Sequence, residues 1–112
     1  MADWVLSVGC LVWATIIVDG KQESRPCIVT AVTPYKSAVL EVVYGQERVP
    51  VAATASHLVR KTSTLGVAFG LTKDTNFCTR AEVYATCIER KCSGICPEFD
   101  LLEILQLAED QR

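Results

Sequence analysis

Residues 9–18 read Gly-Cys-Leu-Val-Trp-Ala-Thr-Ile-Ile-Val. β-Branched and aromatic residues dominate this stretch, and such residues favour strands over helices. The stretch ends at Asp19-Gly20, a dipeptide typical of tight turns, and residues 21–25 after it are polar. We therefore predict a strand over residues 9–18, followed by a turn and a polar loop.

The rest of the chain repeats this pattern of short apolar segments between polar turns. Pro26 is expected to open a second strand that runs to Val32, because the first residue of a strand need not donate a hydrogen bond to the ladder. Residues 56–64 are compatible with either a loop or a helical turn. The other predicted strands are residues 38–44, 48–52, 65–71 and 77–88, with turns at 33–37, 45–47 and 72–76.

The last segment of the chain has the features of an amphipathic helix. Pro97 suits a first helical position, where its missing N–H costs nothing. Acidic residues follow at once, at the positive end of the helix dipole. The apolar face is wide enough to pack on a sheet and leave some surface for a second chain. Five to six strands and one C-terminal helix predict a mainly β fold, a small barrel or α+β domain, over residues 1–112 as a single domain.

Composition excludes several classes of protein. The chain has 112 residues, of which 50% are hydrophobic and 21% charged, so it is neither a disordered tail nor a low-complexity linker. Its formal net charge of −2 gives no support for wrapping duplex nucleic acid. The charges are uneven, because cations outnumber acids between residues 60 and 91 whereas acids outnumber cations between 97 and 112.

The six cysteines bear on the compartment of the protein. In a secreted protein they would suggest disulfides, but the only candidate leader, residues 4–18, lacks a positive start and a cleavage site. This run of 15 residues is also below the roughly 18 needed to span a bilayer. We therefore expect a cytoplasmic protein with no membrane segment and with reduced cysteines, Cys10 and Cys27 being buried in strands.

The sequence gives little support for a zinc site or for a catalytic cysteine. Cys87, Cys92 and Cys96, with Cys78 and His57, are possible zinc ligands, but the paired knuckles of a structural zinc site are missing. No metal or other cofactor is predicted. A cysteine nucleophile activated by His57 has no spacing signature either. Free thiols are the default expectation, with a Cys92–Cys96 disulfide possible on oxidation.

Three segments together resemble the MazF/PemK toxin family, whose members are small SH3-like barrels of about this length. They are the start at residues 9–14 (GCLVWA), the polar loop with Arg-Pro before an aliphatic strand at 24–29 (SRPCIV), and the Gly-Leu turn before a strand at 70–77 (GLTKDTNF). The resemblance covers nearly the whole chain and includes the terminal helix.

The resemblance implies a homodimeric endoribonuclease that cuts single-stranded RNA without metal and is silenced by an antitoxin. In this chemistry a 2′-hydroxyl attacks the adjacent phosphorus, a cation stabilises the phosphorane, and a hydroxyl or carboxylate positions the nucleophile. The family's catalytic arginine corresponds to Arg25, whose guanidinium can bind two phosphate oxygens at once. Residues predicted to contact the substrate are Lys21, Gln46, Lys73 and Thr75.

The third predicted strand departs from the family pattern. Family members carry Ser or Thr at its end, whereas this chain has Tyr44, which we take as the second catalytic residue, followed by Gly45 and Gln46. Other hydroxyls that the fold could bring close are those of Thr33, Thr72 and Thr75. The alternative function is therefore a non-enzymatic SH3-like binding module, such as a phage-encoded inhibitor of a nucleic-acid-binding enzyme, whose carboxylates occupy a basic channel.

Overall fold

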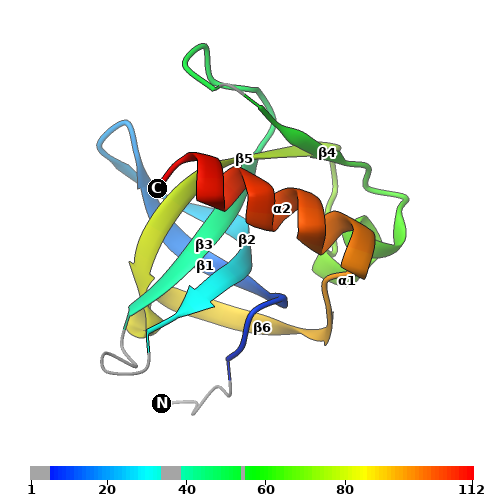
Figure 1. Cartoon of the computed structure of the whole chain (residues 1–112), viewed down its shortest axis with the longest axis horizontal. Coiled ribbons are helices and arrows are strands. Elements are labelled where there is room, and N and C mark those ends of the chain that lie inside the picture. The colour runs from blue at the N-terminus through cyan, green and yellow to red at the C-terminus, as the bar shows by residue number, and fades with distance from the viewer. Residues whose placement is uncertain (1–5, 34–38, 54) are drawn as a thin grey trace.

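The computed structural model describes residues 6–33, 39–53 and 55–112 and has a mainly β architecture. One antiparallel sheet, in the order β4-β5-β3-β2-β1-β6, curls into a partial barrel (Figure 1). The predicted mainly β fold, with five to six strands and a C-terminal helix, is confirmed. The strands are β1 (Cys10–Val18), β2 (Lys21–Val32), β3 (Val39–Gln46), β4 (His57–Val59), β5 (Thr75–Tyr84) and β6 (Ile88–Ile95). The helices are α1 (Thr64–Phe69), α2 (Glu98–Asp110) and a short 3-10 turn, η1 (Ala85–Cys87).

The turn between β1 and β2 is tighter than the sequence suggested. Val18 pairs directly with Lys21, so that only Asp19 and Gly20 lie between the strands. Both turn residues have positive φ, 50° and 77°, which is the geometry of a type I′ turn and matches the right-handed twist of a hairpin. The predicted polar loop at 21–25 is wrong, because these residues form the first half of β2.

Pro26 consequently lies inside β2 rather than at its start. It pairs with Trp13 of β1, but pairing with β3 begins only at Cys27. One side of β2 is therefore without a ladder at Pro26, where a missing N–H is tolerated.

The predicted strand at 65–71 is also wrong, since this segment forms α1. The side-chain hydroxyl of Ser63 caps the helix by accepting from the Gly66 amide at 3.0 Å. Gly70 ends it in the left-handed conformation, with a φ of 73°. The run LGVAF is apolar throughout, and so short a run does not distinguish a strand from a buried helix by its period.

Four other segments have a structure that the sequence did not specify or specified differently. Residues 48–52 form a loop rather than a strand, and the ambiguous segment 56–64 contains the short edge strand β4. The predicted strand 77–88 is divided by η1, and β6 after it was not predicted, because its polar sequence IERKCSGI lacks a strong apolar signal. Residues 34–37 of the predicted turn, Ala38, residue 54, and residues 4 and 5 of the apolar run lie outside the described residues.

The sheet is buried on both faces. Side chains along β1, β2 and β3 alternate between two apolar clusters, so that Leu11, Ile28 and Val43 lie on the outer face and their neighbours on the inner face. The outer cluster is completed by side chains of α1 and α2, such as Phe69 and Ile104. The buried residues of the inner cluster all come from strands, because the curled sheet packs against itself, and Leu6 before β1 packs against them.

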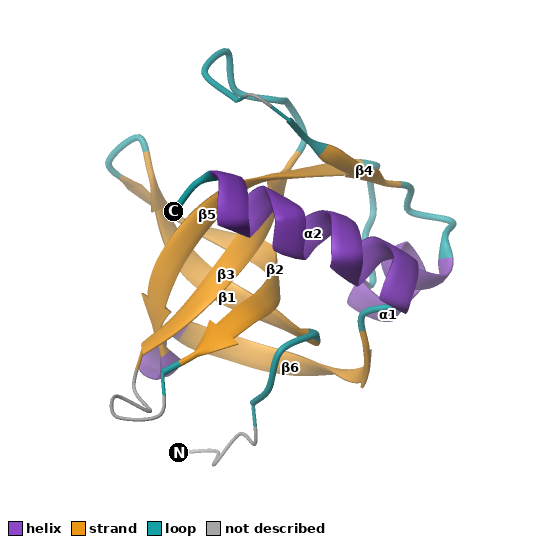
Figure 2. Ribbon diagram, viewed as in Figure 1, coloured by secondary structure: helices purple, strands orange, loops and turns teal. Residues whose placement is uncertain are grey.

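Helix α2 lies across the outer face of the sheet, as Figure 2 shows, and contacts β2, β3, β4 and β5. It starts after Pro97 and buries Ile104, Leu107 and Ala108 against the strands. None of the helices within residues 6–33, 39–53 and 55–112 is long and apolar enough to cross a membrane.

Candidate functional site

Two adjoining clefts open at the end of the sheet where β2 begins, β3 ends and β5 begins. They share Arg25, Gln46 and Glu47 and have volumes of about 490 and 280 Å³. We call them together the Arg25 cleft. The wider part is lined by Val18, Asp19, Lys21, Glu23, Arg25, Gln46, Glu47 and Arg48. The narrower part is lined by Trp13, Ser24, Arg25, Pro26, Gly45, Gln46, Glu47, Leu71, Thr72, Lys73 and Thr75.

The β1–β2 hairpin positions the cationic side of this cleft. Residues alternate across a strand, so Lys21, Glu23 and Arg25 project from the same face of β2. The Glu23 carboxylate accepts a hydrogen bond from Nη2 of Arg25. Nε of Arg25 is buried, and no acceptor binds it within the part of the chain that the structure describes. The Arg25 side chain as a whole is 24% exposed and lines both parts of the cleft, so its charge can meet an anion there.

Glu47 is the centre of a second group of charges on the cleft rim. Nζ of Lys73 donates to its carboxylate at 2.8 Å. This hydrogen bond and the positive charge of Lys73, with smaller effects of Arg48 and Arg25, hold the pKa of Glu47 below its ordinary value. The same contact raises the pKa of Lys73. Both side chains are more than half exposed, so the pair contributes little to stability and can be displaced by a ligand.

Two hydroxyl groups line the narrower part of the cleft. Thr75 is buried, and its Oγ1 donates to the carbonyl oxygen of Lys73 at 3.0 Å, which leaves its oxygen free to accept. Thr72 lines the same wall. Gly45 permits this arrangement, because a Cβ at that position would lie 2.4 Å from Cγ2 of Thr75. Thr33, the third hydroxyl considered from the sequence, lies at the opposite end of the sheet.

Trp13 gives the narrower part an aromatic wall. Its indole nitrogen donates to the carbonyl oxygen of Phe69 at 2.9 Å, and its ring meets the Phe69 ring edge-on at 6.4 Å. The guanidinium of Arg90 lies 5.3 Å from the centre of the indole ring. These contacts fix the ring in one orientation, as a platform for a planar group requires.

The structure thus brings together five of the six residues that the sequence indicated as a site, namely Lys21, Arg25, Gln46, Lys73 and Thr75. Tyr44 does not line the Arg25 cleft. It is 8% exposed, packs in the inner cluster beside Cys27, and borders an adjoining cleft of about 530 Å³ that shares Val18, Asp19 and Gln46 with the wider part. The structure does not place Tyr44 as a partner of Arg25.

Sequence reasoning assigned no role to Trp13 or Glu47. Trp13 lies in the motif at residues 9–14 and pairs with Pro26, the neighbour of Arg25. Correct pairing of the first two predicted strands would therefore have placed Trp13 beside Arg25. Glu47 directly follows Gln46 and was expected in a turn. Nothing in the sequence indicates its contact with Lys73, 26 positions further on.

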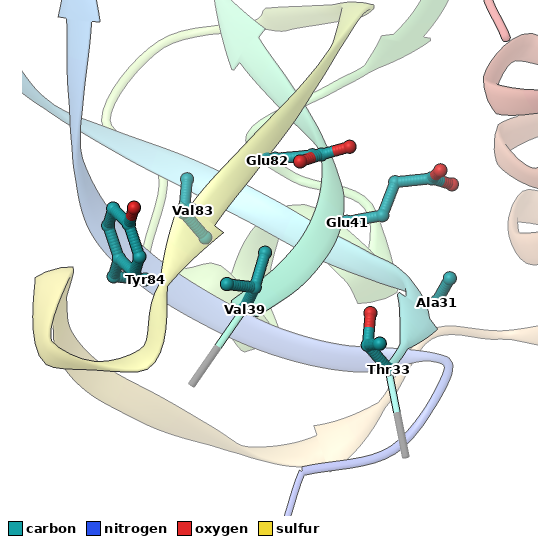
Figure 3. Close-up of a pocket in the computed structure, with 7 residues that line it drawn as sticks. All are labelled: Ala31, Thr33, Val39, Glu41, Glu82, Val83 and Tyr84. Atoms are coloured by element: carbon teal, nitrogen blue, oxygen red, sulfur yellow. The ribbon is translucent and has the colours of Figure 1, made fainter. Parts of the chain in front are cut away.

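A further cavity lies at the other end of the same strands. It has a volume of about 590 Å³, and Figure 3 shows Glu41 and Glu82 side by side on neighbouring strands at its edge. Glu41 is buried, and its two oxygens accept from Oγ1 of Thr30 at 2.7 Å, Nε of Arg80 at 2.8 Å and Nη2 of Arg112 at 2.8 Å. Nε of Arg112 provides a fourth contact at 3.1 Å.

The hydrogen bonds to Glu41, that of Arg112 foremost, lower its pKa to about 2, although burial acts in the opposite direction. Gln111 also links α2 to β5 through two bonds, to the Cys78 carbonyl at 2.7 Å and from the Arg80 amide at 2.8 Å. We call Thr30, Glu41, Arg80 and Arg112 the Glu41 cluster. The oxygens of Glu41 accept from Thr30, Arg80 and Arg112, so the cluster fastens the end of α2 to the sheet.

The cysteines do not form a second site. All six have free thiols, and only Cys87 is more than marginally exposed. Burial raises the pKa of the Cys27 and Cys96 thiols to about 12 each, which disfavours the thiolate that a nucleophile needs. Nε2 of His57 lies 2.6 Å from Oδ1 of Asp100, so this histidine is engaged by α2. Over residues 6–33, 39–53 and 55–112, no group of three or more His, Cys, Asp or Glu side chains is arranged to hold a metal ion.

No protein-family model, curated protein or solved structure matches this chain.

Proposed function

We propose that the Arg25 cleft binds single-stranded RNA and cleaves it without a metal ion, as the resemblance to the MazF/PemK toxins implies. One observation carries the proposal: a partly exposed arginine, an exposed lysine, two threonine hydroxyls and a tryptophan ring line one cleft. Cations suit the RNA backbone, and an aromatic ring suits an unpaired base.

In the proposed reaction the 2′-oxygen of one nucleotide attacks the adjacent phosphorus. The new O2′–P bond forms while the P–O5′ bond breaks, giving a 2′,3′-cyclic phosphate and a 5′-hydroxyl end. Arg25 stabilises the negative charge that gathers on the phosphorane oxygens. Glu23, which already binds Arg25, accepts the proton of the 2′-hydroxyl, and Lys73 supplies a proton to the leaving oxygen.

The threonines have a supporting part in this reaction, and Tyr44, which lines another cleft, has none. Thr75 and Thr72 line the wall next to Lys73, where their oxygens can accept from a 2′-hydroxyl of a neighbouring nucleotide, because the single proton of the attacking 2′-hydroxyl goes to Glu23. Gln46 and Lys21 contact the flanking nucleotides. The proposal includes the other properties that the resemblance implies, which are a cytoplasmic location, a homodimer and an antitoxin partner.

The test is cleavage of single-stranded RNA by the purified protein in EDTA. We expect the wild type to cut and Arg25→Ala to be slower by about 100-fold or more, the usual cost of removing a group that stabilises transition-state charge. Arg25→Lys keeps the charge but loses the planar fork, so it is expected to lie between the two. Arg60→Ala is the matched control, because Arg60 is an exposed arginine that lines neither part of the cleft.

Two results would refute the proposed ribonuclease activity. One is a folded wild-type protein that leaves RNA of varied sequence intact, and the other is Arg25→Ala cutting at the wild-type rate while Arg60→Ala does the same. The products also identify the chemistry, because a cyclic phosphate end follows only from attack by the 2′-oxygen.

The non-enzymatic binding module is the second candidate. It is favoured by the charges of the cleft itself, because both Arg25 and Lys73 already have carboxylate partners in Glu23 and Glu47. Three carboxylates and four cations line the cleft, so its field is only weakly positive. RNA that binds without being cut, or no RNA binding at all, would favour this module over the ribonuclease.

A further inference from the structure

The first turns of α2 expose two large apolar side chains next to each other. Phe99 is 74% exposed and Leu102 is 61% exposed, and their spacing of three residues places them on one side of the helix. A third exposed apolar residue, Ile95, lies at the end of β6, three residues before the helix begins. A group of this kind is rarer on a monomer surface than single exposed apolar residues.

These side chains are not needed to hold α2 on the sheet. The helix already buries Ile104, Leu107 and Ala108, and its far end is fastened by the Glu41 cluster and Gln111. Phe99 and Leu102 lie on the side that faces away from these contacts. Their exposure is therefore a surface property that the fold itself does not explain.

Acidic side chains border this apolar pair on both sides. At 100° per residue, Glu98 lies on one side of the pair and Glu103 on the other. The exposed Gln106 continues the same face, and Glu109 and Asp110 lie about 10 Å further along the helix. All four acids are exposed. Among the ion pairs of the described residues, only Glu109 of these four takes part, with Arg112. The exposed face of α2 is thus an apolar patch of Phe99 and Leu102 with acidic side chains on both sides, and it continues as a polar and acidic surface towards the end of the helix.

This charge pattern decides between the possible occupants. A second copy of α2 would bring acidic side chains against acidic side chains, and the helix contains no lysine or arginine to balance them. An anionic membrane surface would be repelled in the same way. A helix with an apolar stripe between lysines or arginines satisfies both the apolar patch and the acids beside it.

We propose that the exposed face of α2, centred on Phe99 and Leu102, docks a cationic amphipathic helix of another protein. Phe99 and Leu102 pack into the partner's apolar stripe, and the acids on both sides pair with its cations. The inference does not depend on RNA cleavage, because this face and the Arg25 cleft have no residue in common.

The probe is a fluorescent peptide of about four helical turns, built from leucine and lysine with the leucines on one face. We expect saturable binding at physiological salt, measured by fluorescence anisotropy. The same pattern with glutamate in place of lysine should not bind. The double variant Phe99→Ser, Leu102→Ser and the double variant Glu98→Lys, Glu103→Lys should each weaken binding about tenfold or more.

Matched controls separate docking from general charge or stickiness. Val67 of α1 is 68% exposed, and Glu82 of β5 is an exposed acid outside α2, so Val67→Ser and Glu82→Lys should bind as the wild type does. Circular dichroism verifies that every variant is folded.

Three outcomes would overturn the proposal. One is a failure of the wild type to bind the lysine peptide, and another is equal binding by the α2 variants. The third is a wild-type dimer, measured by light scattering, that Phe99→Ser, Leu102→Ser converts to a monomer, since a second copy would then occupy the face.

Discussion

Charged side chains cluster at both ends of strands β2, β3 and β5, but the two clusters differ in burial and in hydrogen bonding. At one end the Glu41 carboxylate is buried and receives four hydrogen bonds from Thr30, Arg80 and Arg112. At the other end Arg25 has a buried Nε without an acceptor in the described chain, and the Lys73–Glu47 pair is exposed. A buried, fully hydrogen-bonded carboxylate such as Glu41 stabilises the fold, whereas the exposed Lys73–Glu47 pair can be displaced by a ligand.

We expect the largest effect on folding stability from Glu41→Gln. The amide nitrogen of glutamine would face the donors of Arg80 or Arg112, so hydrogen bonds are lost and two cations are left without their carboxylate. We expect the free energy of unfolding to fall by about 2–3 kcal/mol in urea. Glu82→Gln is the control, since Glu82 is exposed, and it should change stability by less than about 0.5 kcal/mol. Equal stabilities of the two variants would remove the contrast between the two ends.

A pH titration of stability sharpens the same contrast. The pKa of Glu41 is lowered to about 2 in the folded protein, against an ordinary value of 4.5. Its contribution is therefore complete above the ordinary value and is lost as pH falls towards 2. We expect the stability difference between wild type and Glu41→Gln to narrow over this range. If the stability difference between the two proteins stayed constant down to a pH of about 2, the charge of Glu41 would not be the cause of that difference.

The smallest effect on stability is expected at the Arg25 cleft. Lys73→Ala removes an exposed ion pair and should change the free energy of unfolding by less than about 0.5 kcal/mol. If Lys73 contacts a phosphate, the slope of log affinity for single-stranded RNA against log salt should become shallower by about 0.7. Arg60→Ala, measured in parallel, should leave the slope unchanged. If Lys73→Ala destabilised the protein as much as Glu41→Gln does, the charges at both ends of the strands would contribute to folding stability.

The sequence predicted the fold where the apolar pattern was strong. Strands β1, β2 and β3 are rich in β-branched residues, and α2 has a proline at its start and a wide apolar face. α1 was misassigned because LGVAF is apolar on every side, and its helical form depends on Ser63 and on burial of Phe69 in the outer cluster. β6 was missed because its strand form depends on pairing with β1 rather than on its own residues.

The site was predictable only in part, for a similar reason. Arg25, Lys73 and Thr75 were indicated by short motifs that the resemblance supplied. The contact of Glu47 with Lys73, and the packing of Trp13 on Phe69, join elements far apart in the chain, so no local pattern reports them. Tyr44 was chosen for its place at the end of a strand. A bulge between Tyr44 and Gly45 and the packing of its ring in the inner cluster could not be inferred from that place.

The two-residue turn at Asp19-Gly20 has a consequence for the register of β1 and β2. β1 and the second half of β2 are apolar on both faces, so a shift of β2 by one residue against β1 would still bury apolar side chains there. The hydrophobic pattern alone therefore specifies the register of the two strands only weakly. The two-residue turn fixes this register, because it pairs Val18 with Lys21. If β2 shifted by one residue against β1, Arg25 would turn to the opposite face of the sheet and leave the cleft. The short turn therefore contributes to the position of Arg25 as well as to the connection of the two strands.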